Sequence, residues 1–184
     1  DTQDAVLPPQ IDVYDAALLQ QLETLPDGVI APSERIAPLQ PDHLACVLHT
    51  SGSSGKPKGA ANTHSALINN FSRLQSMLKL DASDRILQKT AIGFDVAVWE
   101  WFLPLMKGAQ LVIAEPWGHK DPSYIARLIE EKSITVQHFV PSALSVFLDE
   151  LSARDGQSLK HILSGGEALT ETLQGRVFSE LPNT

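Results

Sequence analysis

The sequence predicts an α/β fold built around a mainly parallel sheet. From residue 44 onward, short apolar runs of strand length alternate with longer stretches of helical periodicity. Strands that alternate with helices form βαβ units, and the strands of such units run parallel. The chain has 184 residues, of which 43% are hydrophobic and 20% charged, so it is long enough to bury a core.

The first part of the chain is predicted to lie outside this core. A short apolar start is stopped by Pro8-Pro9, and a helix-like stretch follows from Ala16 to Leu22. Residues 26–42 contain four prolines and little periodicity, which is typical of an extended connector. We therefore divide the chain into an N-terminal remnant and connector, residues 1–43, and an α/β core, residues 44–184.

The core is predicted to begin with a strand, residues 44–49, and then a loop from which Ala60 and Ala61 lead into a helix. The further strands are expected at residues 86–87, 111–114, 134–140 and 159–163. The helices are expected at residues 64–79, 95–107, from Asp121-Pro122, at 141–151 and after Thr170, a residue suited to capping a last helix. Their inward faces include Ile68, Phe71, Leu74, Trp99, Phe102, Leu103, Leu144, Phe147, Leu173, Val177 and Phe178.

Residues 50–59 form the most informative stretch, and they read Thr-Ser-Gly-Ser-Ser-Gly-Lys-Pro-Lys-Gly. Glycines allow close approach of the backbone, successive N–H groups make anion-binding turns, and hydroxyls and lysines suit phosphate. A flexible linker is the alternative, because linkers are also rich in serine and glycine. The closely spaced elements on both sides favour a phosphate loop, and the spacing of the glycines excludes a Walker A motif.

Parallel sheets bind ligands beyond the carboxyl ends of their strands. The segments that follow the predicted strands are residues 50–59, residues 91–95, His138 and residues 164–167. We expect these segments to meet at one edge of the sheet.

Three motifs, in this order, resemble those of adenylation domains of nonribosomal peptide synthetases, within the adenylate-forming enzymes. They are residues 44–59 with the phosphate loop, Gly93-Phe94-Asp95-Val96-Ala97-Val98-Trp99-Glu100, and Ser164-Gly165-Gly166-Glu167-Ala168-Leu169. The departures are small: Ser54 stands where threonine is commoner, and Ala97 replaces a frequent serine. The resemblance implies a flavodoxin-like sheet with helices on both faces, a subdomain of the large domain of these enzymes, truncated at both ends.

The resemblance also implies the roles of individual residues. The residues implied in binding ATP are Thr50, Ser51, Gly52, Ser53, Ser54, Gly55, Lys56, Lys58, Gly59, Gly166 and Glu167, the last two near the adenine unless they form a plain turn. Asp95 is implied to pair with the α-ammonium of an amino acid, although an aspartate can also serve there as a helix N-cap. The side-chain pocket is implied at Val96, Trp99, His138, Leu163 and Gly165, with core packing as the alternative for Trp99. No metal ligand is assigned, and no catalytic residue beyond the phosphate loop.

The implied reaction forms an aminoacyl adenylate from an amino acid and ATP, with Mg²⁺, and passes the acyl group to a phosphopantetheinyl carrier domain. The pocket residues indicate a small or medium polar amino acid, with serine slightly favoured, while Gly165 leaves room for glutamate, glutamine or arginine. An acyl- or aryl-CoA synthetase and an inactive α/β module remain alternatives. We expect this chain alone to be inactive, because the motifs that complete the site and the remaining parts of the adenylation domain would lie outside it.

Bulk properties limit the other partners. A net charge of −8 argues against a nucleic-acid or anionic membrane surface, and no apolar run is long enough to span a membrane. The single cysteine, Cys46, fits a reducing compartment, so we expect a cytoplasmic protein.

Overall fold

The structure is a computed structural model that describes residues 15–26, 28–50, 56–151 and 156–184. The chain divides into two compact units, Asp1–Leu39 and Gln40–Thr184. The domain division at residue 43 stays a prediction.

The first unit contains the predicted helix and one short turn. Helix α1 (Ala16–Glu23) begins after Asp15, whose carboxylate accepts hydrogen bonds from the N–H groups of Ala17 and Leu18. Such a side chain satisfies amide groups that the first turn leaves without a partner. The 3₁₀ turn η1 (Pro32–Glu34) lies within the proline-rich segment.

The second unit begins with a small antiparallel sheet of β1 (Leu44–Thr50) and β2 (Lys58–Thr63), in which Thr50 lies opposite Lys58. Two predictions were wrong here. Residues 60–61 belong to a strand and not to a helical lead-in, and β1 is not part of the parallel sheet. Alanine favours helix locally, but pairing with β1 satisfies the backbone of this segment, and such long-range contacts override propensity.

Helix α2 (His64–Leu78) follows β2 directly, and the Thr63 hydroxyl accepts a hydrogen bond from the Ala66 N–H at 3.2 Å to cap it. Phe71 and Leu74 are buried as predicted, whereas Ile68 is 49% exposed.

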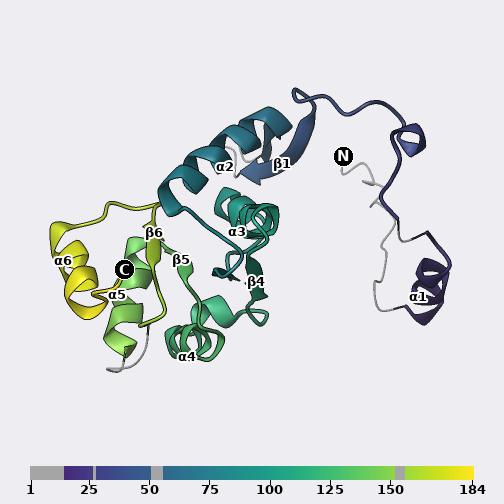
Figure 1. Cartoon of the computed structure of the whole chain (residues 1–184). Coiled ribbons are helices and arrows are strands. Elements are labelled where there is room, and N and C mark those ends of the chain that lie inside the picture. Colours follow the sequence, from purple (N-terminus) through teal and green to yellow (C-terminus); the bar gives the residue numbers. More distant parts are fainter. Residues whose placement is uncertain (1–14, 27, 51–55, 152–155) are drawn as a thin grey trace. The chain divides into compact units, whose positions relative to one another are not determined.

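The main sheet contains four parallel strands in the order β4-β3-β5-β6. These are β3 (Arg85–Gln88), β4 (Gln110–Ile113), β5 (Val136–Phe139) and β6 (His161–Ser164). The connecting helices are α3 (Asp95–Met106), α4 (Pro122–Lys132) and α5 (Pro141–Glu150), with the 3₁₀ turn η2 (Gly118–Lys120) before α4 and α6 (Glu171–Glu180) after β6 (Figure 1). The chain moves outward from β3 to β4 and then crosses to β5 on the other side of β3, which is the strand order of a flavodoxin-like sheet. The predicted fold class is confirmed.

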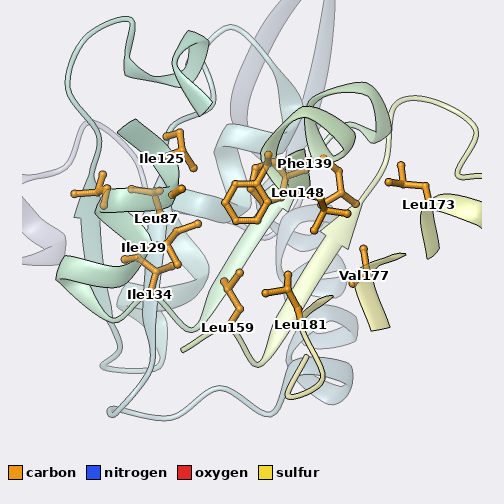
Figure 2. Packing of buried hydrophobic residues seen from close by; sticks show 14 residues of the cluster. Leu87, Ile125, Ile129, Ile134, Phe139, Leu148, Leu159, Leu173, Val177 and Leu181 are labelled. Carbon is orange, nitrogen blue, oxygen red and sulfur yellow. The ribbon is translucent and has the colours of Figure 1, made fainter. Parts of the chain in front are cut away.

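Helices cover both faces of this sheet, because neighbouring strand residues point to opposite sides. Ile86 packs with α2 and α3, on the side that also contains Phe71, Trp99 and Leu103. Leu87 packs on the other side in the larger cluster, which α4, α5 and α6 complete (Figure 2). Besides Ile68, two further residues that were predicted to face the core are exposed: Phe102 is 54% and Phe178 is 60% exposed.

A polar network joins the amino ends of β3, β5 and β6. The buried Asp84 carboxylate accepts hydrogen bonds from the Thr135 hydroxyl at 2.9 Å and from the Lys160 ammonium at 2.8 Å. Burial opposes the charge of Asp84, but these hydrogen bonds outweigh it and hold the pKa of the carboxyl below its usual value. The network ties the starts of β3, β5 and β6 together.

Candidate functional site

The site lies at the carboxyl ends of β3, β5 and β6, beside the point where the strand order reverses. At such a point the connections that follow two neighbouring strands lead in opposite directions, and a crevice remains between them. In this chain, the connection from β3 carries Asp95, the end of β5 carries His138, and β6 carries Leu163 and is followed by Gly165. The main sheet therefore brings together all the predicted pocket residues.

Asp95 is the first residue of α3 and not its N-cap, because Phe94 holds that position with an extended backbone. The only hydrogen bond described for the Asp95 carboxylate comes from the adjacent Val96 N–H, at 2.9 Å. The carboxylate is exposed at the helix N-terminus, where the helix dipole favours a negative charge. It therefore remains available to a cationic group.

A cavity of about 410 Å³ opens beside Asp95. Its lining includes five of the six predicted pocket residues: Asp95, Val96, Trp99, His138 and Leu163. Val96 and Trp99 are three residues apart on α3, so both face the same side, and His138 and Leu163 are direct partners across β5 and β6. The lining combines apolar side chains with polar ones such as Asp95 and His138, and small ligands commonly bind in cavities of this size.

Gly165, the sixth predicted pocket residue, does not line this cavity itself but lies next to His138, which does. A Cβ atom on Gly165 would lie 3.7 Å from His138 Nε2, which is ordinary van der Waals contact. A larger side chain would extend farther from the same position. The glycine therefore leaves space next to the imidazole.

His138 is held neutral. It is only 8% exposed, and burial lowers its pKa to about 4, assisted by the positive charge of Lys89 and opposed by Asp95. A neutral imidazole has one N–H donor and one acceptor nitrogen. It can thus form a hydrogen bond with a polar ligand without adding charge to the cavity.

Two charged residues beside the site were missed by the sequence analysis. Glu100 on α3 is fully buried and accepts hydrogen bonds from the Thr90 N–H at 3.1 Å and hydroxyl at 2.7 Å. Burial raises the pKa of Glu100, while Thr90 and Lys89 oppose this. Lys89 Nζ lies 4.8 Å from the centre of the Phe139 ring, and burial lowers its pKa. A lone carboxylate inside the apolar sequence of α3 was the available signal for Glu100.

The predicted phosphate loop is described only in part. Ser51, Gly52, Ser53, Ser54 and Gly55 lie outside the described residues. Thr50, Lys56, Lys58 and Gly59 are exposed, and Thr50 pairs with Lys58 at the end of the small sheet. The two lysines place positive charge on this hairpin. Binding of phosphate here stays a prediction.

Gly166 and Glu167 have clear structural tasks. Gly166 has φ = +87°, a conformation that favours glycine, and a Cβ there would lie 3.3 Å from Val140 Cγ1. The Glu167 carboxylate accepts hydrogen bonds from the Ser142 N–H and hydroxyl, both at 2.9 Å, and so caps the start of α5. These contacts fit the turn that was the alternative; a role near the adenine stays a prediction.

Within the described parts of the chain, no group of three or more His, Cys, Asp or Glu side chains is arranged to hold a metal ion. In the same residues, no helix is both long enough and apolar enough to cross a bilayer. Cys46, in β1, is half-buried.

Comparison with known proteins extends these observations. Residues 2–184 match the family described as AMP-binding enzyme. The chain is 43% identical over 145 residues to phosphinothricin tripeptide synthetase PhsB of Streptomyces viridochromogenes, covering 79% of this chain and 12% of that protein. It is 39% identical over 168 residues to tyrocidine synthase 3 of Brevibacillus parabrevis, covering 91% of this chain and 2% of that protein. The chain therefore spans only a small part of these relatives.

Solved structures show the same arrangement. The nonribosomal peptide synthetase FmoA3 superposes with a TM-score of 0.72 at 28% identity, over 80% of this chain and 16% of FmoA3. The Vibrio cholerae adenylation domain AlmE, in complex with glycyl-adenosine-5′-phosphate, superposes with a TM-score of 0.71 at 28% identity, over 79% of this chain and 28% of AlmE.

Proposed function

Because the chain belongs to the AMP-binding enzyme family, among the adenylation domains of nonribosomal peptide synthetases, we propose that the protein that carries it activates an amino acid with ATP. The product would be an aminoacyl adenylate, which makes the whole protein a ligase. A phosphopantetheinyl carrier domain would then receive the acyl group on its thiol.

The observation that carries this proposal is the position of Asp95 at the cavity of Val96, Trp99 and His138. Among the described residues that line the cavity, Asp95 is the only acidic one, and His138 is neutral. A single carboxylate beside the Val96 and Trp99 side chains is complementary to a ligand with an ammonium group and a separate side chain. A fatty or aryl acid has no group that would use Asp95.

In the proposed reaction, a carboxylate oxygen of the amino acid attacks the α-phosphorus of ATP. A new P–O bond forms, the bond from the α-phosphorus to the bridging oxygen breaks, and pyrophosphate leaves with that bond's electron pair. Such reactions depend on cations and donors positioned near the developing charge. Lys56 and Lys58 supply positive charge from this chain, and Asp95 orients the amino acid. Mg²⁺, expected for the whole enzyme, would neutralise phosphate charge, but the described residues offer no acidic cluster to hold it.

Two features of the cavity favour a small or medium polar amino acid as the substrate. His138 offers one donor and one acceptor, and Gly165 leaves space beside it. The likeness of the pocket residues to serine-activating domains puts serine slightly ahead within this class.

Amino-acid-dependent exchange of pyrophosphate into ATP by the full-length protein tests the proposal. With the preferred amino acid, Asp95→Ala should lower kcat/KM by about 10- to 100-fold, because a hydrogen bond to a charged group is lost. Asp42→Ala removes an exposed carboxylate that does not line the cavity, and it should change kcat/KM by less than about threefold.

Exchange with fatty or aryl acids alone would contradict the proposal and favour an acyl- or aryl-CoA synthetase. We also expect the 184-residue chain by itself to show no exchange; measurable activity would contradict the view that the site needs further parts of the protein.

A further inference from the structure

Helix α2 lines the same cavity that contains Asp95. Ala66, Asn70 and Arg73 recur at helical spacing and all line this cavity. Arg73 is the only charged residue among them. The sequence pattern of α2 predicts core packing and does not indicate a place in the site.

Arg73 has no acidic partner among the residues that the structure describes. Among the described residues, the only hydrogen bond of the Arg73 side chain runs from Nη1 to Met77 Sδ at 3.5 Å. A thioether sulfur is a weak acceptor. The carboxylates that form ion pairs within the described parts of the chain belong to other cations. The guanidinium is therefore available to an anion in the cavity.

The cavity thus has two opposite charges on different elements. Asp95 is at the start of α3, and Arg73 is on α2. His138 lies on β5, the strand between β3 and β6, and carries no charge. Within the described lining, Arg73 is the only positive group. Arginine binds carboxylates with two parallel hydrogen bonds, and a planar anion suits it better than a hydroxyl does.

We propose that Arg73 determines specificity by binding the side-chain carboxylate of an acidic amino acid. This inference rests on the proposed function, in which Asp95 holds the α-ammonium group. The α-carboxylate must reach ATP, so the group left for Arg73 is the one at the end of the side chain. Gly165 provides the space that a chain longer than that of serine needs. Within the polar class proposed above, this favours glutamate or aspartate over serine.

The test measures exchange by the full-length protein with glutamate, aspartate, glutamine and serine. We expect the highest kcat/KM for an acidic amino acid. Arg73→Leu should lower that value by about tenfold or more, mainly through KM, and change the value for glutamine or serine by less than about threefold. Arg73→Lys keeps the charge and should recover part of the loss. Arg127→Leu is the matched control, because Arg127 is an exposed helical arginine outside the cavity, and it should leave all four values unchanged.

Unchanged thermal unfolding of the Arg73→Leu protein would show that it folds, and the partial recovery in Arg73→Lys provides a second check. A preference for serine or another neutral amino acid in the unmodified protein would overturn this inference and leave the proposed function intact. An equal loss for acidic and neutral amino acids in Arg73→Leu would also overturn it, because that result indicates a purely structural role. Absence of exchange with every amino acid would overturn the proposed function, and this inference with it.

Discussion

Acidification should destabilise the folded chain through His138. The folded state holds this imidazole neutral with a pKa of about 4, whereas an unperturbed histidine has a pKa of 6.5. As the pH falls, the unfolded chain therefore binds the proton first, and the folded state loses stability. The stability that the neutral His138 adds to the folded state is fully present above about pH 7, and it is lost as the pH falls from about 6.5 to 4. Between about pH 7.5 and pH 5, the loss is about 2 kcal/mol of unfolding free energy.

Urea unfolding of the chain and of His138→Gln at these two pH values measures this effect. Glutamine keeps a donor and an acceptor but does not titrate, so the variant should lose about 2 kcal/mol less than the unmodified chain on acidification. All other residues are the same in both proteins, so their contributions cancel in the difference. NMR titration should give His138 a midpoint near 4, and Lys89→Met should raise it, because the Lys89 charge lowers this pKa. Equal pH dependence in both proteins, or a midpoint near 6.5, would refute the reasoning.

Two further predictions concern stability, each measured as the unfolding free energy in denaturant. Phe147→Ala should cost about 3–5 kcal/mol, because it opens the larger core, whereas Val146→Ala, at a 47% exposed side chain, should cost less than about 1 kcal/mol. Similar losses in both variants would contradict the described packing. Gly166→Ala should cost about 1–2 kcal/mol, because its φ is +87°. Gly175→Ala, in the middle of α6 with open space around it, should instead stabilise by about 0.5–1 kcal/mol. A stabilising Gly166→Ala would contradict the positive φ of Gly166.

Much of the fold could be predicted because periodicity reports burial directly. After residue 85, the alternation of strand-like and helix-like patterns placed each strand of the main sheet and each helix next to it to within a few residues. Proline or threonine marked the starts of α4, α5 and α6. The region before it was less predictable. Residues 58–63 contain no strongly apolar alternation, and only their pairing with β1, across the loop, makes them a strand.

The candidate site followed from the strand ends and the motifs, but its electrostatics did not. Sequence position indicated Asp95 and His138 as neighbours of a crevice. The neutral state of His138 depends on burial and on Lys89, which directly follows β3 in the chain. Arg73 could not be found from the sequence, because the stripe it shares with Asn70 reads as an ordinary exposed helix face.

By itself, the sequence determined the class of fold, the order of its elements, the family motifs and the residues that parallel topology gathers at one edge. These depend on local periodicity and chain connectivity, which a linear pattern contains. Only the tertiary structure decided which charges share a cavity, which side chains are buried there and which elements complete its walls. Those properties depend on distances between residues far apart in the chain, and a charge acquires its pKa and its partner only when such residues meet.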